Sequence, residues 1–461
     1  MKGVTNMLSK KSSFVHLSQA MKNSFSELNL GKHLRNAGIT KKFGFSCFSI
    51  FQLLFLLVFE HRNWYQAGLS KNAVDLPGKD TIYRFLKVPT FNWRKFLSSL
   101  SFDVILRFQK LTSSKRVSVF IIDDSVYSRN RSKNVELLSR VHDHVTHKFV
   151  KGFSLLTLGW SDGFSFVPVD FSLLSSSNVT NRFCEIDALI DKRTSGYKRR
   201  LEAIQSKPEV ASNLIQHALE KGLTADYVLM DTWFTHAPLI EFITENGLFV
   251  IGMVKQMKQR YRYDDRLLKL EELFKLVRPT LEKKDVFGSI QVCLQTENQT
   301  PVKIVFVRNR NKKSEWLAIL STDTALSDEE IVRIYGMRWE IETFFKCTKS
   351  LLKLAKEFQG RSYDSMISHT TLVFTRYILL EWQRRNERDP KTIGHLFFLM
   401  CEDIKDLDMF TALQKLIELF ETMSKGSVSL NTKTLISQLT QWFESLPSYI
   451  KGSLRFSLCE S

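Results

Sequence analysis

The sequence predicts an α/β fold in which a β-sheet is layered with helices, carries a β-rich insertion and is flanked by helical regions at both ends. Three observations support this prediction. Between residues 116 and 254, short apolar runs alternate with amphipathic stretches, as strands alternate with helices. Between residues 255 and 322, short strand-like runs follow one another without a long helical pattern. Before residue 112 and after residue 375, apolar residues recur at helical spacing.

The N-terminal region is basic and predicted to be helical. Its first 42 residues contain many lysines and arginines but a single acidic residue, Glu27. The run Phe43–Phe59 is strongly apolar, yet a membrane span needs about 20 such residues, and this run also contains Ser46 and Gln52. We therefore predict a buried helix here, with a membrane span as the alternative. The helical pieces around Pro89 are compatible with a DNA contact of the helix-turn-helix type, although the pattern is not specific.

The elements of the α/β region follow in order along the chain. The β-branched run "RVSVFIIDDS" ends in two aspartates, and the residues Ser161–Gly163 indicate a hairpin turn between two strands. The helix expected at Pro208–Leu223 is opened by proline and closed by Gly222. It is followed by a strand over Tyr227–Asp231, a helix over Ala237–Gly247 and another strand to residue 254.

The last third of the chain is predicted to be helical. Ser327 and Glu330 form a capping-box pattern at the start of a long helix. The chain is thus expected to divide into a basic helical N-terminal DNA-binding region (1–112), the first part of an α/β core (113–254), a β-rich insertion (255–322), a core helix that carries Glu342 (323–375) and a helical C-terminal region for DNA binding or dimerisation (376–461).

Four polar residues form a narrow stripe on the long helix. At about 100° per residue, Tyr335, Arg338, Glu342 and Lys349 fall within an arc of roughly 60°. The apolar residues of the same helix lie elsewhere around its axis. Amphipathic helices often carry such a stripe only as a solvated face with charge pairs. This stripe, however, combines an aromatic ring, cations and one carboxylate, which suits a ligand that contains phosphate and a base.

Two further carboxylate positions lie at the ends of apolar strands. Asp123 and Asp124 end one strand, and Asp231 ends another. In α/β sheets functional groups gather at the carboxyl ends of strands, although a single such Asp is often only a helix cap or turn residue. Converging carboxylates repel one another unless a cation neutralises them. Hard divalent ions such as Mg²⁺ or Mn²⁺ prefer these oxygen ligands, and two such ions can serve phosphodiester displacement.

These motifs resemble a known family. The spacing Tyr335-x2-Arg338-x3-Glu342-x6-Lys349 matches the Y-R-E-K signature of bacterial insertion-sequence DDE transposases of the IS-four type at all four positions. The blocks "IIDDS" and "DTWF" resemble the surroundings of the two aspartates of that family. The order Asp, Asp, β-rich insertion, Glu is also similar. The resemblance covers residues 115–360 well and the helical ends loosely.

The resemblance implies an RNase H-like catalytic core, two Mg²⁺ ions, for which Mn²⁺ can substitute, and cut-and-paste movement of a DNA element. Asp124, Asp231 and Glu342 would be catalytic and hold the metal ions. Asp124 is preferred to Asp123 because Ser125 follows it, as in the family block, but the strand boundary leaves both open. The DNA-binding residues would be Tyr335, Arg338, Lys349 and Trp233, where Trp233 would stack a displaced base unless it is a core residue.

The implied partners are double-stranded DNA, namely the terminal inverted repeats and the target, and a second copy of the chain in a synaptic complex. A membrane is not expected. The resemblance also implies a bacterial cytoplasmic protein that works at the nucleoid. The six scattered cysteines, without a CxxC pair, agree with a reducing compartment. The alternative function is a non-catalytic, sequence-specific DNA-binding protein, for which a basic N-terminal region would be sufficient.

The net charge of +18 also indicates nucleic acid as a partner. Three basic runs, residues 192–200, 255–263 and 308–313, are interpreted as phosphate contacts, which position DNA without determining sequence. The histidines His142, His144 and His147 match no standard zinc spacing, so polar or DNA-facing roles are expected for them.

Overall fold

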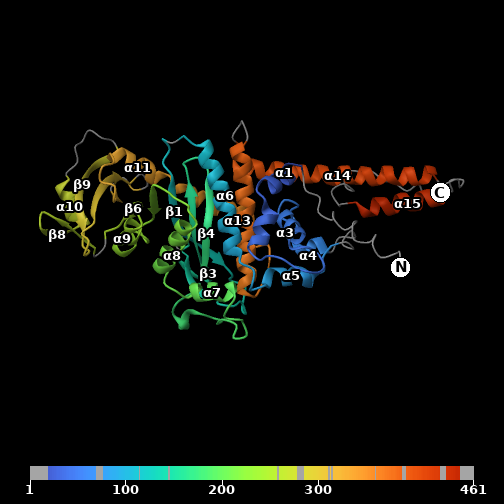
Figure 1. Cartoon of the computed structure of the whole chain (residues 1–461), viewed down its shortest axis with the longest axis horizontal. Coiled ribbons are helices and arrows are strands. Elements are labelled where there is room, and N and C mark those ends of the chain that lie inside the picture. Colours follow the sequence, from blue (N-terminus) through green and yellow to red (C-terminus); the bar gives the residue numbers. More distant parts are fainter. Residues whose placement is uncertain are drawn as a thin grey trace.

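A large sheet lies at the centre of the molecule, in this computed structural model, with a β-rich part on one side of it and helices on the other (Figure 1). The structure describes residues 19–68, 76–113, 115–143, 146–256, 259–277, 285–309, 312, 315–358, 360–386, 391–425 and 432–446. None of the helices within these ranges is long and apolar enough to cross a membrane.

The core of the sheet has five strands in the order β4-β3-β1-β5-β6. The strands are β1 (Val119–Ser128), β3 (Lys148–Ser161), β4 (Phe166–Leu174), β5 (Tyr227–Met230) and β6 (Phe249–Val254). β1, β3 and β4 are antiparallel neighbours, whereas β5 and β6 run parallel to β1. Three antiparallel strands followed by two parallel ones, with the first strand at the centre, is the RNase H-like arrangement, which confirms the expected fold.

The β-rich segment continues the same sheet. Its last strand, β11 (Trp316–Ser321), pairs antiparallel with β6. Beyond it lie β10 (Pro301–Arg308), β9 (Val286–Leu294), β7 (Arg260–Tyr263) and β8 (Arg266–Lys269), with the short helix α10 (Leu270–Leu276) packed alongside. The segment is therefore joined edge to edge with the core, and its main-chain pairing fixes the orientation of the two parts relative to each other.

Helices cover both faces of the core. α8 (Lys207–Glu220) lies on one face, while α12 (Trp339–Ser350) and α13 (Tyr363–Asn386) pack on the other. Two ring contacts show how α12 and α13 pack on β4. Phe374 of α13 contacts Phe171 of β4 with ring centroids 5.0 Å apart, and Phe344 of α12 contacts Phe166 of β4, also at 5.0 Å. α9 (Ala237–Glu245) connects β5 to β6, and α11 (Asp328–Gly336) precedes α12.

The N-terminal helices pack around α13. They are α1 (Gln19–Glu27), α2 (Leu30–Asn36), α3 (Cys47–Leu56), α4 (Trp64–Gly68), α5 (Lys79–Lys87) and α6 (Trp93–Leu111). The apolar run Phe43–Phe59 contains α3, whose core-facing side chains are buried, so the prediction of a buried helix is confirmed. The guanidinium of Arg376, on α13, is fully buried, donates to the Phe55 carbonyl at 3.0 Å and pairs with Glu357 at 2.7 Å.

The C-terminal helices form an arm that projects from the body (Figure 1). α14 (Ile393–Lys425) is the long helix of this arm, and α15 (Thr432–Ser445) lies beside it. Trp442 of α15 donates its indole N–H to the Ala412 carbonyl of α14 at 3.1 Å. The two helices therefore pack as a hairpin.

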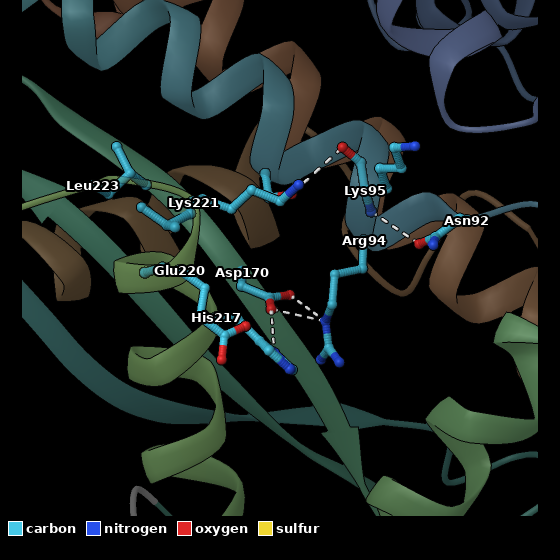
Figure 2. Close-up of a pocket in the computed structure, with 11 residues that line it drawn as sticks. Asn92, Arg94, Lys95, Asp170, His217, Glu220, Lys221 and Leu223 are labelled. Carbon is cyan, nitrogen blue, oxygen red and sulfur yellow. Dashed lines mark hydrogen bonds and ion pairs between the residues drawn. The ribbon is translucent and has the colours of Figure 1, made fainter. Parts of the chain in front are cut away.

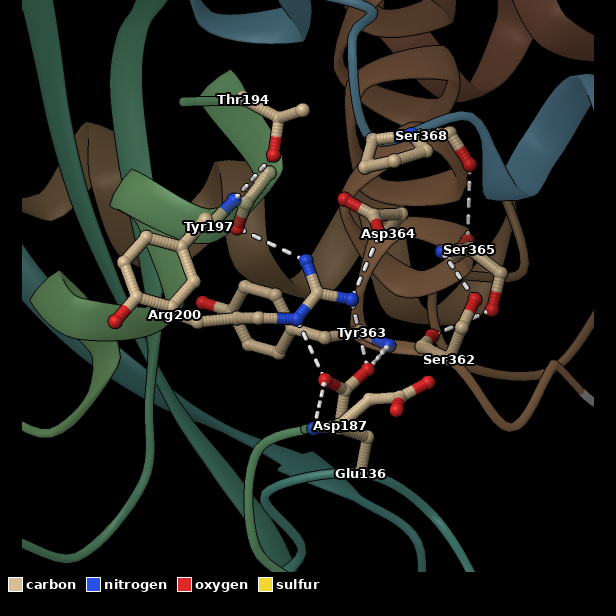
Figure 3. Close-up of polar contacts among 12 residues, drawn as sticks. Glu136, Asp187, Thr194, Tyr197, Arg200, Ser362, Tyr363, Asp364, Ser365 and Ser368 are labelled. Atoms are coloured by element: carbon tan, nitrogen blue, oxygen red, sulfur yellow. Dashed lines mark hydrogen bonds and ion pairs between the residues drawn. The ribbon is translucent and has the colours of Figure 1, made fainter. Parts of the chain in front are cut away.

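One basic run is partly buried. Residues 192–200, interpreted above as phosphate contacts, include the first part of α7 (Ser195–Ala203), where Arg199 and Arg200 are buried. Arg200 binds Glu136 at 2.5 Å and Asp364 at 2.7 Å, as Figure 3 shows. Arg193 pairs with Asp191 at 2.9 Å. The interpretation of this run as a set of phosphate contacts is therefore wrong for Arg199 and Arg200, because both are buried. The Arg193 side chain is 91% exposed, so a phosphate contact by this residue stays a prediction.

Candidate active site

Two aspartates lie side by side at the point where β5 ends. β1 continues past this point to Ser128, so the expectation that Asp123 and Asp124 end a strand is wrong. β1 and β5 are in register up to Ile122 and Met230, so Asp123 and Asp231 are the next residues on neighbouring strands. Burial raises the pKa of Asp123 to about 7, and the nearby Asp231 carboxylate contributes to the increase. Two carboxylates this close favour a proton or a cation between them.

A tight turn holds the Asp231 carboxylate. Its Oδ1 accepts hydrogen bonds from the backbone N–H groups of Trp233 at 2.9 Å and Phe234 at 3.2 Å. The Thr235 hydroxyl donates to the Asp231 carbonyl at 2.6 Å. Phe234 is fully buried and anchors the turn. The orientation of Asp231 is therefore set by local backbone geometry, as for an Asx-turn.

The predicted long helix is two helices joined by a tight turn. α11 ends at Gly336 and α12 begins at Trp339. Between them, Met337 donates to the Ile334 carbonyl and Arg338 to the Tyr335 carbonyl, both at 3.0 Å, which are contacts of the 3₁₀ type. The predicted start of this segment is confirmed, since the Ser327 side chain caps the Glu330 N–H at 3.2 Å. The break places Arg338 at the joint, directly before the helix that carries Glu342.

Arg338 bridges two of the carboxylates. Its Nη1 lies 3.0 Å from Asp123 Oδ2, and its Nη2 is paired with Glu342 one turn further along. The Tyr335 ring lies beside it, with the guanidinium carbon 5.9 Å from the ring centroid. Burial raises the pKa of Tyr335 to about 12, so this phenol is neutral. The structure thus brings Tyr335, Arg338 and Glu342 close to Asp123. Asp123 was not part of the stripe predicted on the helix.

Lys349, the last residue of the stripe, reaches the same strand. Its Nζ lies 2.5 Å from the Ser125 hydroxyl, two residues after Asp123 on the same face of β1. Burial lowers the pKa of Lys349, while Asp143 and Asp124 oppose this decrease. Phe344 lies between Glu342 and Lys349 on α12 and holds this helix in place, because its ring packs against the rings of Phe374 and Tyr377, with centroids 4.9 and 4.8 Å away.

Asp124, which the sequence favoured over Asp123, points the other way. Successive side chains of a strand alternate between its faces, and Asp124 lies on the face that α8 covers. Its Oδ2 accepts a hydrogen bond from Ser154 at 2.5 Å and lies 3.0 Å from Lys207 Nζ. The structure therefore places Asp123, not Asp124, beside Asp231 and Arg338. No pattern in the sequence pairs Lys207 with Asp124, so this contact was not predictable.

Trp233 is partly exposed beside the aspartate pair. Its side chain is 43% exposed, and Lys207 Nζ lies 4.3 Å from the centroid of its ring system. A core role for Trp233 is therefore wrong, and its ring is available to a ligand. His142 lies on β2 (Ser139–Asp143), in ring contact with Phe149, whereas His144 lies outside the described residues.

The chemistry of the donor set suits a hard divalent ion. Asp123, Asp231 and Glu342 offer only carboxylate oxygens, which Mg²⁺ and Mn²⁺ prefer. The proximity of Asp123 to Asp231 is the observation that fits a cation, because burial with a neighbouring negative charge raises the pKa of Asp123. Arg338 at present lies between Asp123 and Glu342, and within the described ranges no three acidic, histidine or cysteine side chains are grouped closely enough to hold an ion.

A pocket of about 220 Å³ lies elsewhere, between α6, β4 and α8 (Figure 2). Its central charges are already paired: Arg94 binds Asp170 at 2.7 Å and Glu202 at 2.7 Å. His217 points at the same carboxylate of Asp170, at 3.9 Å. Asp123, Asp231 and Glu342 do not line this pocket.

Comparisons with known proteins add independent information. Residues 67–310, more than half of the chain, match the family described as "DDE superfamily endonuclease". Residues 288–365 match the family described as "Archaeal putative transposase ISC1217". The first match includes Asp123 and Asp231, and the second includes Glu342. A solved structure of piggyBac transposase in a synaptic complex with hairpin DNA is similar at 11% identity and a TM-score of 0.42, over 96% of this chain and 89% of that chain. No curated protein matches this chain.

Proposed function

The chain belongs to the DDE superfamily of endonucleases, and from this premise we propose that it is a transposase that moves a DNA element by a cut-and-paste reaction. Water would first attack a phosphodiester at each element end and release a 3′-hydroxyl. That hydroxyl would then attack a phosphodiester of the target DNA, with a target 3′-oxygen as the leaving group. Both steps are in-line displacements at phosphorus, so one set of residues can serve them.

The arrangement around Arg338 carries this proposal. Asp123 and Asp231 are neighbours on parallel strands, and Glu342 lies on the other side of the Arg338 guanidinium. We propose these three carboxylates as the catalytic set, with Asp123 in the role that was expected for Asp124. A non-catalytic DNA-binding protein would have no need to gather three carboxylates on a surface meant for a polyanion, because their charge repels phosphate.

We propose that the same three carboxylates hold divalent metal, Mg²⁺ in the first instance. The bound ions would lower the pKa of the attacking water or hydroxyl and stabilise the leaving oxygen. The chain's own residues would orient the DNA around that centre. Arg338 would have to release at least one carboxylate, and its planar fork is then free to bind a phosphate through two hydrogen bonds.

The remaining predicted residues surround this centre on both sides. Tyr335 is neutral and lies beside Arg338, where its phenol can donate to a phosphate oxygen. Lys349 can exchange the Ser125 hydroxyl for a backbone phosphate. The exposed ring of Trp233 offers a surface for an unpaired base, and such stacking contributes about 1–3 kcal/mol per base. These residues would position the scissile phosphate and would not select a particular DNA sequence.

The hairpin of β7 and β8 is a further proposed DNA contact. Arg260 lies directly across from Lys269, and Arg262 is two residues further along the same face. All three side chains are exposed. Like charges directly opposite each other destabilise a strand pair, so the arrangement is better explained by an anionic partner. Part of the second basic run is thereby proposed as a phosphate contact, with element ends and target DNA as the duplexes.

Two element ends must be joined for this reaction, so we propose that a homodimer acts on them in a synaptic complex. We also propose that the Tyr335–Lys349 motif makes the chain a relative of the IS-four type. The N-terminal helices would bind the element ends, because α5 presents Lys79 and Lys87 on both sides of the Tyr83 ring, at 6.0 and 5.9 Å from its centroid. A basic helix face of this kind is the usual electrostatic footprint for DNA.

The proposed function is tested with duplex DNA that carries the inverted repeats flanking the coding region. The full chain is incubated with this DNA in Mg²⁺, in Ca²⁺ and in EDTA, and cut positions are mapped at nucleotide resolution. We expect cuts at the element ends in Mg²⁺ alone, followed by joining to a target plasmid. End binding in all three conditions without cleavage in Mg²⁺, or in a parallel incubation with Mn²⁺, would show that the protein is not a transposase.

A further inference from the structure

Asp124 is committed to two partners on the face of the sheet away from Glu342. Ser154 donates to its Oδ2 at 2.5 Å, and Lys207 Nζ lies 3.0 Å from the same oxygen. The Asp124 and Lys207 side chains are only 17% and 19% exposed. A largely buried ion pair is screened less by water than a fully exposed one, so the attraction that holds its geometry is stronger.

Lys207 has a second contact, with the exposed tryptophan of the active site. Its ammonium lies 4.3 Å from the Trp233 ring centroid, within the range of a cation–π interaction. Lys207 is the first residue of α8, and Ser206 caps this helix: its hydroxyl accepts a hydrogen bond from the Glu209 N–H. The backbone of Lys207 is therefore fixed. Asp124 therefore holds a cation across the face of the Trp233 ring.

Trp233 in turn belongs to the turn that holds a proposed metal ligand. Its backbone N–H donates to Asp231 Oδ1 at 2.9 Å. The contacts thus run without a gap from Asp124 through Lys207 and Trp233 to Asp231. Asp231 lies beside Asp123 on the neighbouring strand. The contact of Lys207 with the Trp233 ring therefore adds to the backbone hydrogen bonds and the buried Phe234 that hold this turn.

We propose that Asp124 and Lys207 are positioning residues that fix the Asp231 turn through the ring of Trp233, and that Asp124 itself is not a metal ligand. The inference rests on the proposed function, since it assigns Asp231 to the metal. Residues that orient metal ligands from outside contribute roughly 10–100-fold to metal affinity or activity. Loss of a direct ligand, by contrast, should remove cleavage altogether.

The test compares six variants of the full chain: Asp124→Asn, Lys207→Met, the double variant of these two, Lys207→Arg, Asp123→Asn and the control Lys221→Met, an exposed residue that caps the far end of α8. Three quantities are measured: cleavage of end DNA against Mg²⁺ concentration, binding of Mn²⁺ to the DNA-free protein by electron paramagnetic resonance, and the fluorescence of Trp233. The last is obtained as the difference between each protein and its own Trp233→Phe derivative.

We expect Asp124→Asn and Lys207→Met to cleave at saturating Mg²⁺ but to need about 10–100-fold more of it, with matching decreases in Mn²⁺ affinity. Both should shift the emission of Trp233, and combining them should add little, because they break one chain of contacts. Lys207→Arg should restore most of the affinity, and Lys221→Met should resemble the wild type. Asp123→Asn should not cleave at any Mg²⁺ concentration.

Two results would overturn the inference. One is an Asp124→Asn protein that fails to cleave at every Mg²⁺ concentration while its Trp233 emission is unchanged, since that is the behaviour of a direct ligand. The other is unchanged Mn²⁺ affinity and emission in Lys207→Met. If the wild type itself neither binds Mn²⁺ nor cleaves, the proposed function fails, whereas the emission of Trp233 still reports whether Asp124 and Lys207 hold the ring.

Discussion

At the scale of single residues, the choice between two adjacent aspartates depends on which face of β1 each one occupies. The sequence places Asp123 and Asp124 at one strand end but does not say which of them faces the helix with Glu342. The structure resolves this through the partners, Arg338 for Asp123 and Lys207 for Asp124. Because strand side chains alternate, a shift of one residue moves the carboxylate to the other face.

Arg338 is predicted to act through its shape as well as its charge. Its two terminal nitrogens contact different carboxylates, which a single lysine ammonium cannot reproduce. We expect Arg338→Lys to lower the rate of cleavage by roughly 10–100-fold, by analogy with other residues that orient metal ligands. Single-turnover cleavage of end DNA measures this. A Lys variant with wild-type rates would show that charge alone is sufficient.

The three residues of the signature that flank Glu342 were predictable because a helix has a fixed period. Tyr335, Arg338 and Lys349 were expected on one stripe, and the structure brings all three to the β1 side of the helix. The position of Asp123 beside Asp231 could not be predicted in the same way, because it depends on the register between β1 and β5, which the sequence does not give. Lys207 was missed, since its contacts join residues that lie far apart in the sequence.

At the scale of elements, α12 depends on a few aromatic contacts for its position. Phe344 is fully buried between β4 and α13, against Phe166, Phe374 and Tyr377. We predict that Phe344→Ala lowers the free energy of unfolding by about 3–5 kcal/mol. Urea denaturation followed by circular dichroism measures the change.

The same variant should not cleave DNA even where it remains folded, because Glu342 lies two residues earlier on this helix. The matched control is Phe398→Ala on α14, whose side chain is 54% exposed and should cost little stability. Equal destabilisation by the two substitutions would contradict the assignment of Phe344 as the anchor of α12.

The pairing of α6 with α7 predicts a defined response to acid. Burial alone would raise the pKa of Glu202, but Arg94 overcomes this effect and lowers it to about 2. The folded-state pKa lies below the ordinary 4.5, so the stabilisation is complete above pH 4.5 and disappears as the pH falls towards 2. Glu202→Gln should remove this component, which amounts to at most about 1.4 kcal/mol per pH unit.

Urea denaturation at several pH values between 5 and 2 measures this effect. The control is Glu402→Gln on α14, where the carboxylate is exposed. If the stability of Glu202→Gln falls with pH as steeply as that of the wild type, Glu202 is not the group responsible.

Element boundaries separate what the sequence could and could not predict. The hairpin at Gly163, which has a φ of 78°, and the helix closed by Gly222, with a φ of 79°, were both expected from residues that favour these conformations. Arg199 and Arg200 of α7 were mistaken for phosphate contacts, because arginines in a basic run look solvated in sequence and only the fold brings Glu136 and Asp364 to Arg200. The break before α12 was also missed, although Gly336 at the end of α11 is a residue type that often marks the end of a helix.

At the scale of the whole molecule, the excess of positive charge is unevenly distributed. The hairpin of β7 and β8 carries Arg260, Arg262 and Lys269 as exposed side chains, whereas α14 carries the exposed carboxylates of Glu402 and Asp403. The first surface attracts a phosphate backbone and the second repels it. The arm is therefore expected to face away from DNA.

This distribution predicts a salt dependence of DNA binding. Replacing Arg260, Arg262 and Lys269 together by glutamine should weaken binding to any duplex and reduce the slope of log K against log salt by about one for each phosphate that the variant no longer neutralises. Fluorescence anisotropy at several salt concentrations measures the slope. Lys405→Gln on the arm is the control and should leave it unchanged. An unaltered slope in the triple variant would exclude the hairpin from the DNA path.

The central claim is that Asp123, Asp231 and Glu342 carry out metal-dependent strand cleavage, and Glu342→Gln tests it most directly. This substitution keeps the size of the side chain and removes its charge, so folding and end binding should be preserved. Cleavage of end DNA in Mg²⁺ is measured beside the wild type and the Glu402→Gln control. We expect the control to cut like the wild type, and Glu342→Gln to bind the ends without cutting them. Cleavage by Glu342→Gln at the wild-type rate would contradict the claim.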